Sequence, residues 1–339
     1  MLPIETPRLR VRAMCADDAA EFSAYRSDPD VARFQSWATP VDVEAARRFI
    51  AEQQHLDGPT PDEWVQLAVE RDGQLAGDVA VNLDTHSRVA RLGYSLAPAH
   101  QGRGLASEAV GAVVDALVDD LGVHRVEAAL DPRNVASARL LENLGFDHEG
   151  TAISSMFFKG AWVDDTLYGL TAERRRAWRD RPRHPPEEVR LGEVTVDNAE
   201  VVFELATHYS QRRFVAPMAD SFADALFPAI ENGAPVVPWL RAIEADGVLG
   251  GFMMTAERTA AHPETYLWRL LIDRWHQRRG IGDRALALLV DRLRAAGETT
   301  LLVGWSPGPG GPERFYLARG FVPTGHVDED GEIEARLTF

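Results

Sequence analysis

The stretch Gln101-Gly102-Arg103-Gly104-Leu105-Ala106 decides how this chain folds, because a second copy, Gln277-Arg278-Arg279-Gly280-Ile281-Gly282, follows later in the sequence. Both copies read Gln-x-x-Gly-x-Gly/Ala, follow an apolar run and open an amphipathic segment. A Gly-Phe pair then follows each copy, at Gly145-Phe146 and at Gly320-Phe321. A repeat of both the motif and its order predicts a duplicated domain that binds the same phosphate-bearing ligand twice.

Length and composition indicate a globular protein of two domains. The chain has 339 residues, of which 45% are apolar and 26% charged, and its formal net charge is −16. This length suits about two domains of ordinary size. The acidic balance argues against nucleic-acid binding, which needs a basic surface, and it favours cationic partners.

The sequence offers no sign of a metal site or a membrane segment. Cys15 is the single cysteine, so an internal disulfide and a cysteine-rich zinc site are excluded. No apolar run approaches the roughly 20 residues that span a bilayer, and Met1 to Arg8 lack the regions of a signal peptide. We therefore expect a cytoplasmic monomer or homodimer without a nucleic-acid or membrane partner.

A proline-rich segment, Pro182-Arg183-His184-Pro185-Pro186-Glu187-Glu188, separates the two halves. Such a segment cannot continue a helix and favours extended structure. We predict an N-terminal domain over residues 1–181, a linker over 182–188 and a C-terminal domain over 189–339. The basic run over 174–181 is interpreted as a helix end that enters the linker, with an RNA contact as the alternative.

Apolar periodicity predicts the same order of elements in both halves. In the first half we expect strands over 8–12, 64–70, 75–83 and 91–96, a helix over 104–121, a strand over 126–130 and a helix over 136–144. In the second half we expect strands over 249–254 and 266–272, a helix over 282–295, a strand over 300–305, a short helix over 312–318 and a strand over 335–339. The predicted class is α/β (α+β), with a mixed, mostly antiparallel sheet flanked by helices in each domain.

A strand that leads into a glycine-rich turn at a helix N-terminus forms an anion site. The first helical turn has unpaired N–H groups, and the helix dipole adds partial positive charge. Glycine permits the close approach of a pyrophosphate, and Arg103, Arg278 and Arg279 add charge. Helix packing is the alternative use of such a turn. A P-loop is excluded because its motif is absent, and a Rossmann site because the loops come late in each half with the wrong spacing.

The order strand, Gln-x-x-Gly-x-Gly/Ala, helix, strand, helix, Gly-Phe resembles the GNAT superfamily of acyl-CoA-dependent N-acetyltransferases, in both halves. The N-terminal half is similar to the ribosomal-protein alanine acetyltransferase (RimJ/RimL) branch through the segments Thr6 to Arg12, Gly102 to Ala109, Asn134 to Arg139 and Gly160 to Asp164. The C-terminal half resembles diamine and polyamine acetyltransferases through the segments Tyr266 to Arg269, Phe315 to Phe321 and Asp330 to Glu334.

The resemblance implies acetyl-CoA as the cosubstrate. It assigns cofactor binding to the loop residues Gln101, Gly102, Arg103, Gly104, Leu105, Ala106 and Ser107, and to Gln277, Arg278, Arg279, Gly280, Ile281 and Gly282. Asn134 and Ser137 match positions that contact the pantetheine arm. In such folds a free backbone N–H polarises the thioester, and the resemblance locates it near Leu96 and near Ile272.

The resemblance also makes Tyr316 the strongest catalytic candidate, because many GNAT enzymes carry there the tyrosine that protonates the sulfur of coenzyme A. A tyrosine that packs a helix against the sheet is the alternative. Leu141 stands at the equivalent position of the first half. In that half Ser137 or a water replaces the acid, or the half is slow or inactive.

The general base stays open. Glu70 and Asp78 lie on predicted central strands of the first half, and Asp273 and Glu264 flank the key strand of the second half. Each of these is a candidate base, and a solvated carboxylate is the alternative for each.

The acidic segment Asp328 to Glu334 follows the second Gly-Phe pair, which borders the acceptor side in GNAT folds. Carboxylates there attract a cationic amine, and a solvated hairpin is the alternative. We expect an acyltransferase that acetylates a primary amine of a small cationic acceptor, such as a polyamine or an aminoglycoside-like antibiotic. The alternatives are a protein or peptide N-terminal acetyltransferase and a non-catalytic acetyl-CoA-binding regulatory protein.

Overall fold

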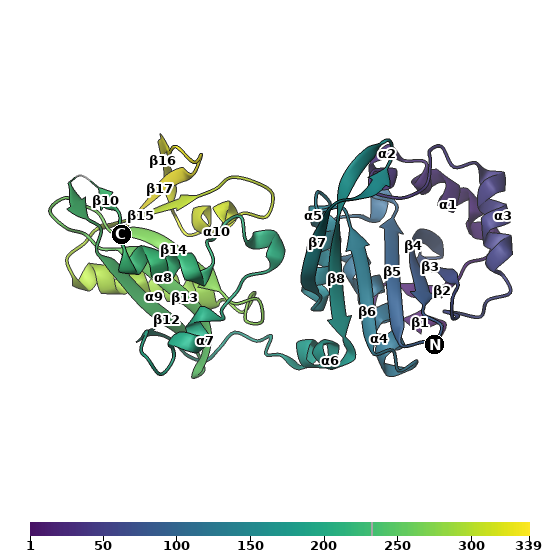
Figure 1. Cartoon of the computed structure of the whole chain (residues 1–339), viewed down its shortest axis with the longest axis horizontal. Helices are drawn as coiled ribbons and strands as arrows, with labels where there is room; N and C mark the ends of the chain where they lie inside the picture. Colours follow the sequence, from purple (N-terminus) through teal and green to yellow (C-terminus); the bar gives the residue numbers. More distant parts are fainter. Residues whose placement is uncertain (232) are drawn as a thin grey trace. The chain divides into compact units, whose positions relative to one another are not determined.

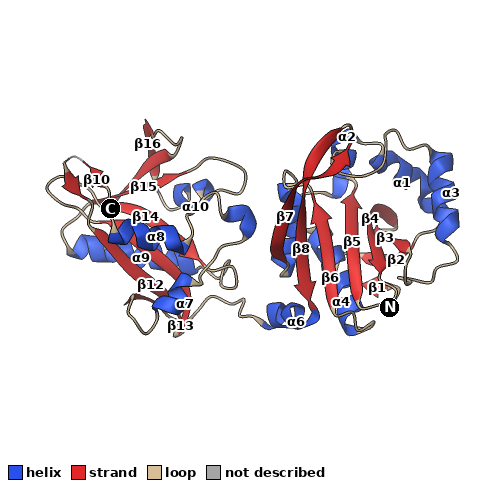
Figure 2. Ribbon diagram, viewed as in Figure 1, coloured by secondary structure: helices blue, strands red, loops and turns tan. Residues whose placement is uncertain are grey.

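The computed structural model describes residues 1–231 and 233–339. The chain divides into two compact units, Met1–Asp180 and Arg181–Phe339. Each unit has its own sheet with helices on both faces (Figures 1 and 2). The segment that the sequence analysis treats as a linker falls within the second unit.

The N-terminal unit contains a sheet in the order β1-β2-β3-β4-β5-β6-β8-β7. Its strands are β1 (Ile4–Glu5), β2 (Arg10–Ala13), β3 (Trp64–Arg71), β4 (Gln74–Leu83), β5 (Val89–Leu96), β6 (Arg125–Leu130), β7 (Asp147–Phe158) and β8 (Ala161–Thr171). Its helices are α1 (Ala19–Arg26), α2 (Pro29–Ala32), α3 (Val43–Gln53), α4 (Leu105–Asp119), α5 (Val135–Leu144) and α6 (Ala172–Asp180).

The C-terminal unit contains a sheet in the order β16-β17-β15-β14-β13-β12-β9 and a separate pair of short strands. Its strands are β9 (Val189–Glu193), β10 (Ile230–Glu231), β11 (Ala234–Pro235), β12 (Pro238–Ala245), β13 (Val248–Ala256), β14 (Tyr266–Ile272), β15 (Thr300–Trp305), β16 (Val322–Val327) and β17 (Ile333–Thr338). Its helices are α7 (Ala199–Phe203), α8 (Met218–Leu226), α9 (Ile281–Ala295) and α10 (Glu313–Leu317).

The two sheets repeat one topology. The order β2-β3-β4-β5-β6-β8-β7 in the first unit corresponds to β9-β12-β13-β14-β15-β17-β16 in the second. In each unit, the strand before the glycine loop runs parallel to the strand after the following helix, and the neighbouring pairs are antiparallel. The predicted fold class, two mixed and mostly antiparallel sheets flanked by helices, is confirmed.

The parallel pairs are short, and this leaves one edge of a central strand open in each unit. β5 pairs with β6 only over Val89–Arg91, and β14 pairs with β15 only over Tyr266 and Leu267. Beyond these residues the strands diverge, so residues 92–96 and 268–272 have no strand partner on that side in the described sheets. Both open edges run toward a glycine loop.

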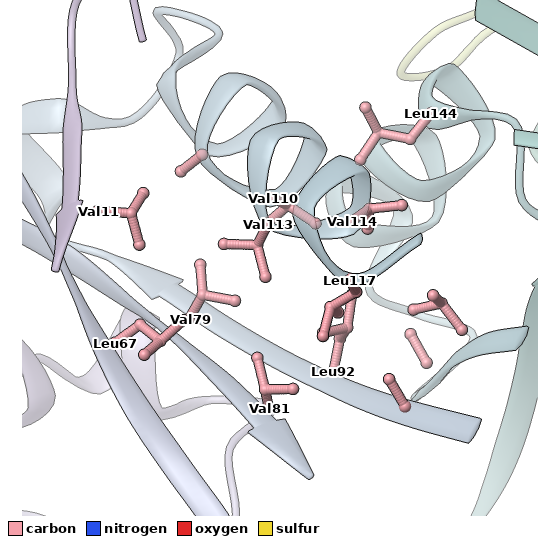
Figure 3. Close-up of a cluster of buried hydrophobic side chains, with 14 of the residues drawn as sticks. Val11, Leu67, Val79, Val81, Leu92, Val110, Val113, Val114, Leu117 and Leu144 are labelled. Atoms are coloured by element: carbon pink, nitrogen blue, oxygen red, sulfur yellow. The ribbon is translucent and has the colours of Figure 1, made fainter. Parts of the chain in front are cut away.

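The helix after each glycine loop packs on one face of its own sheet. In α4, Val110, Val113 and Leu117 recur at the helical spacing and are fully buried. Figure 3 shows these side chains facing Val79 and Leu92 of the sheet. In the second unit α9 buries its own apolar side chains in the corresponding core. The opposite faces are covered by α1 and α3 in the first unit and by α7 and α8 in the second.

The sequence analysis missed the hairpin that ends each sheet, β7–β8 in the first unit and β16–β17 in the second, except for the last strand. The side chains of β7 are mostly exposed, and all those of β16 are exposed. Apolar periodicity depends on one buried face. These outer strands have no such face, so their sequence carries no strand signal.

The basic run over 174–181 lies mostly in α6 and is bound within its own unit. Arg175 is buried and donates to Asp115 at 2.7 Å and to the carbonyl of Leu144 at 2.7 Å. Arg179 donates to Asp119 at 2.6 Å. The run therefore stabilises the N-terminal unit, and its ion pairs do not support the RNA alternative.

A membrane-spanning helix needs about 20 predominantly apolar residues. None of the helices in residues 1–231 and 233–339 is long and apolar enough to cross a bilayer.

We predict that Asp18 contributes to stability above about pH 4. Burial alone would raise the pKa of Asp18, but hydrogen bonds from Arg12 and from the Cys15 amide hold this pKa below its ordinary value. A lowered folded-state pKa gives stability that is present above the unfolded-state pKa and lost as the pH falls through the folded-state pKa. Asp18→Asn should cost about 2 kcal/mol at neutral pH.

Urea unfolding at several pH values checks this prediction. The difference between the wild type and Asp18→Asn should shrink as the solution becomes strongly acidic. An equal difference at neutral and acidic pH would contradict the assignment.

Candidate active site

Each glycine loop ends at a helix N-terminus with unpaired amides. Gly104 and Gly280 are the N-cap residues of α4 and α9, with φ values of 74° and 77°. The first amides bonded into the helices belong to Glu108 and Arg284, which donate to the carbonyls of these glycines. Among the described residues, the amides between each glycine and its bonded partner make no backbone hydrogen bond. Both turns therefore have the donor set that binds an anion.

The glutamine that opens each motif holds the end of the preceding strand. Nε2 of Gln101 donates to the carbonyl of Leu96 at 2.9 Å, and Nε2 of Gln277 donates to the carbonyl of Ile272 at 3.1 Å. The two loops share this contact. The side chains of both glutamines therefore fix the loop to the strand, and their predicted contact with a cofactor stays a prediction.

The amides of Leu96 and Ile272 face the open edges. The residue that follows each strand, Ala97 or Asp273, donates its amide to the neighbouring antiparallel strand. Successive amides of a strand point to opposite sides, so those of Leu96 and Ile272 point away from β4 and β13. These are the positions at which the resemblance locates the thioester donor.

A glycine stands opposite each of these residues, and the sequence analysis missed both. Gly77 pairs with Leu96, and Gly251 pairs with Ile272. A Cβ at Gly77 would lie 2.3 Å from the carbonyl oxygen of Ser95, and one at Gly251 would lie 2.6 Å from that of Leu271. Only glycine fits these positions without moving the strand end. A glycine inside a strand pattern was the available signal.

The arginines of the second loop have different surroundings. Arg278 is exposed and adopts a φ of 62°, where the first loop has Gly102 with a φ of 70°. Arg279 is buried, and its guanidinium donates to the carbonyl of His184 at 2.9 Å and contacts the ring of His276 at 3.1 Å. The side chain of Arg279 thus holds the linker segment, which does not support its predicted role as a loop cation.

The segments before β2 in the first unit and before β9 in the second are hydrogen-bonded to the loop helix of the same unit. In the first unit, the carboxylate of Glu108 accepts from Thr6 at 2.7 Å and from Arg8 at 2.6 Å. At the corresponding position of the second unit, Arg284 donates to the carbonyl of Glu187 at 2.8 Å. Arg8 also donates to the carbonyl of Arg103 at 2.9 Å, which brings a guanidinium to the first loop.

A cavity of about 1400 Å³ lies in the C-terminal unit, beside the open edge of β14. Its lining joins the glycine loop, the open strand edge, Tyr316 and the acidic segment of the β16–β17 hairpin. Pockets for one small ligand measure roughly 300–1,000 Å³, so this cavity has room for an extended cofactor arm and a second molecule. The lining includes Leu270, Ile272, Gln277, Arg278, Gly280, Ile281, Gly282, Tyr316, Asp328, Asp330, Glu332 and Glu334.

Tyr316 lines this cavity and also packs in the core of its unit. Its ring stacks on Trp305 at 5.6 Å and meets Phe315 and Phe321 edge to face. Burial raises the pKa of the Tyr316 hydroxyl well above its usual value. The hydroxyl therefore stays protonated at neutral pH and is a hydrogen-bond donor. The packing alternative and the acid role are thus compatible in one residue.

The N-terminal unit uses the corresponding residues differently. Oδ1 of Asn134 accepts from the amide of Ser137 at 3.2 Å and so caps α5. The hydroxyl of Tyr94 donates to the carbonyl of Ser137 at 3.4 Å. Leu141, at the position of Tyr316, is fully buried in the core. Ser137 remains the polar side chain that the sequence analysis offers as the acid of this unit.

The candidate bases of the first unit are bound to other side chains. Glu70 accepts from Arg12 at 2.6 Å. Asp78 is buried and accepts from Tyr25, and from Arg26 at 3.3 Å. Glu70 thus joins two neighbouring strands, β3 and β2, and Asp78 joins the sheet to α1. This geometry does not support a role as base for either carboxylate.

The two candidate bases of the second unit differ in their position relative to the cavity. Asp273 is buried and accepts from the amides of Ala206 at 3.0 Å and Trp275 at 2.9 Å. It is not among the residues that line the described cavity, so its predicted role as base has no geometric support. Glu264 does line the cavity, but it binds Arg336 at 2.8 Å.

Comparison with known proteins agrees with these features. Residues 8–147 match the family described as an acetyltransferase (GNAT) domain, and residues 201–321 match the acetyltransferase (GNAT) family. An uncharacterized N-acetyltransferase p20 of Bacillus licheniformis is 31% identical over 171 residues, which cover 50% of this chain and 96% of that protein.

Two further proteins resemble part of the chain. The [ribosomal protein uS5]-alanine N-acetyltransferase of Escherichia coli is 39% identical over 80 residues, or 24% of this chain and 41% of that protein. The structure of Mycobacterium smegmatis RimJ in complex with CoA-disulfide is similar with 25% identity and a TM-score of 0.44, over 49% of this chain and 82% of that chain. The chain belongs to the GNAT family of N-acetyltransferases, with one such domain in each half, and acetyl-CoA is its cosubstrate.

Proposed function

We propose that the C-terminal unit transfers the acetyl group of acetyl-CoA to a primary amine of a small cationic acceptor. The observation that carries this proposal is the cavity. One continuous space of about 1400 Å³ connects the glycine loop, the hydroxyl-bearing Tyr316 and the acidic hairpin. These are the cofactor end, the centre and the acceptor end of an acetyl transfer site.

The residues of this unit fit acetyl-CoA. The unpaired amides at the start of α9 and the exposed Arg278 suit the pyrophosphate, and a Cβ at Gly280 would meet no atom within 4 Å, so the turn is open. The open edge of β14 offers the amide of Ile272 to the acyl arm. Acetyl-CoA supplies an activated acetyl thioester, and these residues hold and orient it.

The acceptor end supports a cationic amine. Asp328, Asp330, Glu332 and Glu334 line the cavity, and carboxylates attract and orient an ammonium group. Because these carboxylates line the cavity, the alternative of a hairpin that is merely solvated is less well supported. Both a polyamine and an aminoglycoside carry such ammonium groups.

A thiol-release assay with acetyl-CoA and a panel of diamines, aminoglycosides and neutral amines tests the proposal. Release should depend on acceptor charge and should fall at high salt, which screens exposed charges. Binding of acetyl-CoA without release on any amine or peptide would favour a non-catalytic regulatory protein.

A second candidate function concerns the N-terminal unit. The relative named for alanine acetylation of ribosomal protein uS5 aligns with part of this chain, and that similarity supports a protein or peptide N-terminus as an acceptor of the first domain. Peptides that begin with alanine or serine test this candidate in the same assay, with the corresponding N-acetylated peptides as controls.

We predict that Tyr316→Phe lowers kcat for the cationic amine by about 100-fold. The ring and its packing remain, but the donor to the departing sulfur is lost. The Kd for acetyl-CoA should change less than about 3-fold, because the loop amides carry the phosphate contacts. Calorimetry and thiol release check the two values, and an unchanged kcat would remove Tyr316 from the mechanism.

We predict that Gly104→Glu and Gly280→Glu each abolish one acetyl-CoA binding event. Both glycines have left-handed φ values that favour glycine, and a carboxylate there repels the pyrophosphate. Calorimetric stoichiometry checks this, with circular dichroism as a control for folding. If one variant leaves the stoichiometry unchanged, the corresponding unit does not bind the cofactor.

We predict that Gly251→Ala lowers kcat by about 10- to 100-fold, because the Cβ pushes away the strand end that carries the Ile272 amide. Gly192→Ala is the matched control, since its Cβ would first meet the flexible end of Glu244, at 3.1 Å. Equal kcat values for the two variants would show that the amide needs no such support.

A further inference from the structure

Two polar side chains that are far apart in the sequence lie beside the same glycine on the cavity wall. Tyr266 begins β14, Glu332 directly precedes β17, and Gly304 lies on β15 between these strands. A Cβ at Gly304 would lie 2.1 Å from the hydroxyl oxygen of Tyr266 and 3.2 Å from Oε2 of Glu332. The missing side chain therefore leaves the space that both groups occupy.

This meeting point lies where the central strands separate. Tyr266 and Leu267 are the residues of β14 that pair with β15, and the open edge begins immediately after them. Tyr266, Gly304, Glu332 and Tyr316 all line the cavity that also contains the glycine loop. The carboxylate and the two hydroxyls thus face the space in which an acceptor meets the acyl arm.

Burial and neighbouring charges determine the protonation state of the Tyr266 hydroxyl. Burial and the negative charge of Glu332 raise the pKa of the Tyr266 hydroxyl above its usual value. Tyr266 is therefore protonated at neutral pH, and its hydroxyl has a proton to donate. Tyr266 in turn contributes, after burial, to the raised pKa of Tyr316. Oε1 of Glu332 accepts from the hydroxyl of Ser306 at 3.0 Å, which leaves Oε2 facing Tyr266 and the cavity.

We infer that Glu332 is the general base of the C-terminal unit and that Tyr266 is its positioning residue. This inference rests on the proposed function of that unit. It replaces Asp273, whose oxygens are bound inside the fold. Glu264 also lines the cavity, but its carboxylate is paired with Arg336 at 2.8 Å, whereas no arginine or lysine is paired with Glu332 in the described part of the chain.

Glu332, Tyr316 and the solvent carry the protons of this step. Glu332 takes one proton from the acceptor ammonium and leaves a neutral amine. The nitrogen lone pair forms the bond to the acetyl carbon, and the carbon–sulfur bond breaks with its electron pair on sulfur. Tyr316 gives its proton to that sulfur and regains one from the nitrogen. Glu332 releases its proton to solvent, so one proton is set free per turnover of a charged amine.

Glu332→Gln tests the inference, with Glu329→Gln as the matched control. Both residues belong to the same acidic hairpin, but Glu329 is exposed and does not line the described cavity. With a strongly basic amine, Glu332→Gln should lower kcat by about 100-fold, and Glu329→Gln should change it less than about 2-fold. The KM for acetyl-CoA should stay the same in both variants.

A weakly basic amine such as trifluoroethylamine provides the readout that a purely structural role would not change. This amine is already neutral at the assay pH and needs no base before attack. The loss caused by Glu332→Gln should therefore shrink to less than about 5-fold with this acceptor, since base catalysis acts only where a proton is removed. Tyr266→Phe should show the same dependence on amine basicity with a smaller loss.

Two results would overturn the inference. One is the same kcat for Glu332→Gln and Glu329→Gln, and the other is an equal loss for the basic and the weakly basic amine. Failure of the proposed function has a different signature, namely a wild-type protein that releases no thiol with any cationic amine.

Discussion

The early end of strand pairing beside each glycine loop is the constraint on which both units depend. Because β5 and β14 keep only a few parallel contacts, the rest of each strand has backbone donors without a strand partner. Unpaired donors are costly when buried, so such an edge persists where a ligand satisfies it. The loop glutamines and the opposing glycines maintain this edge, since they hold the strand ends in the same position in both units.

The two units share this frame and differ in the side chains around it. In the first unit, Asn134 caps a helix and Leu141 fills the core. In the second unit, Tyr316 replaces the leucine, and the acidic segment of the β16–β17 hairpin lines the cavity. Duplication therefore preserved the backbone geometry that suits a pyrophosphate and an acyl arm, while the residues that meet the acceptor diverged.

Several polar residues of the motifs hold the fold. Arg279 holds the segment that enters its unit, and Gln101 and Gln277 hold strand ends. Asp273 binds two backbone amides of its own unit. Each of these side chains has a chemistry that also suits a ligand, because a guanidinium or a carboxylate binds protein carbonyls and amides as readily as a phosphate or an amine.

The sequence by itself determined the duplicated fold, the order of its central elements and the two loops, because glycines, apolar periods and caps act over a few residues. Only the tertiary structure decided which carboxylates reach the cavity. Glu332 and Tyr266 are far apart in sequence. They meet because β15 lies between β14 and β17, and its Gly304 has no side chain to fill the space beside both groups. The sequence analysis missed the edge strands β7 and β16 for a related reason, because a strand without a buried face has no apolar pattern.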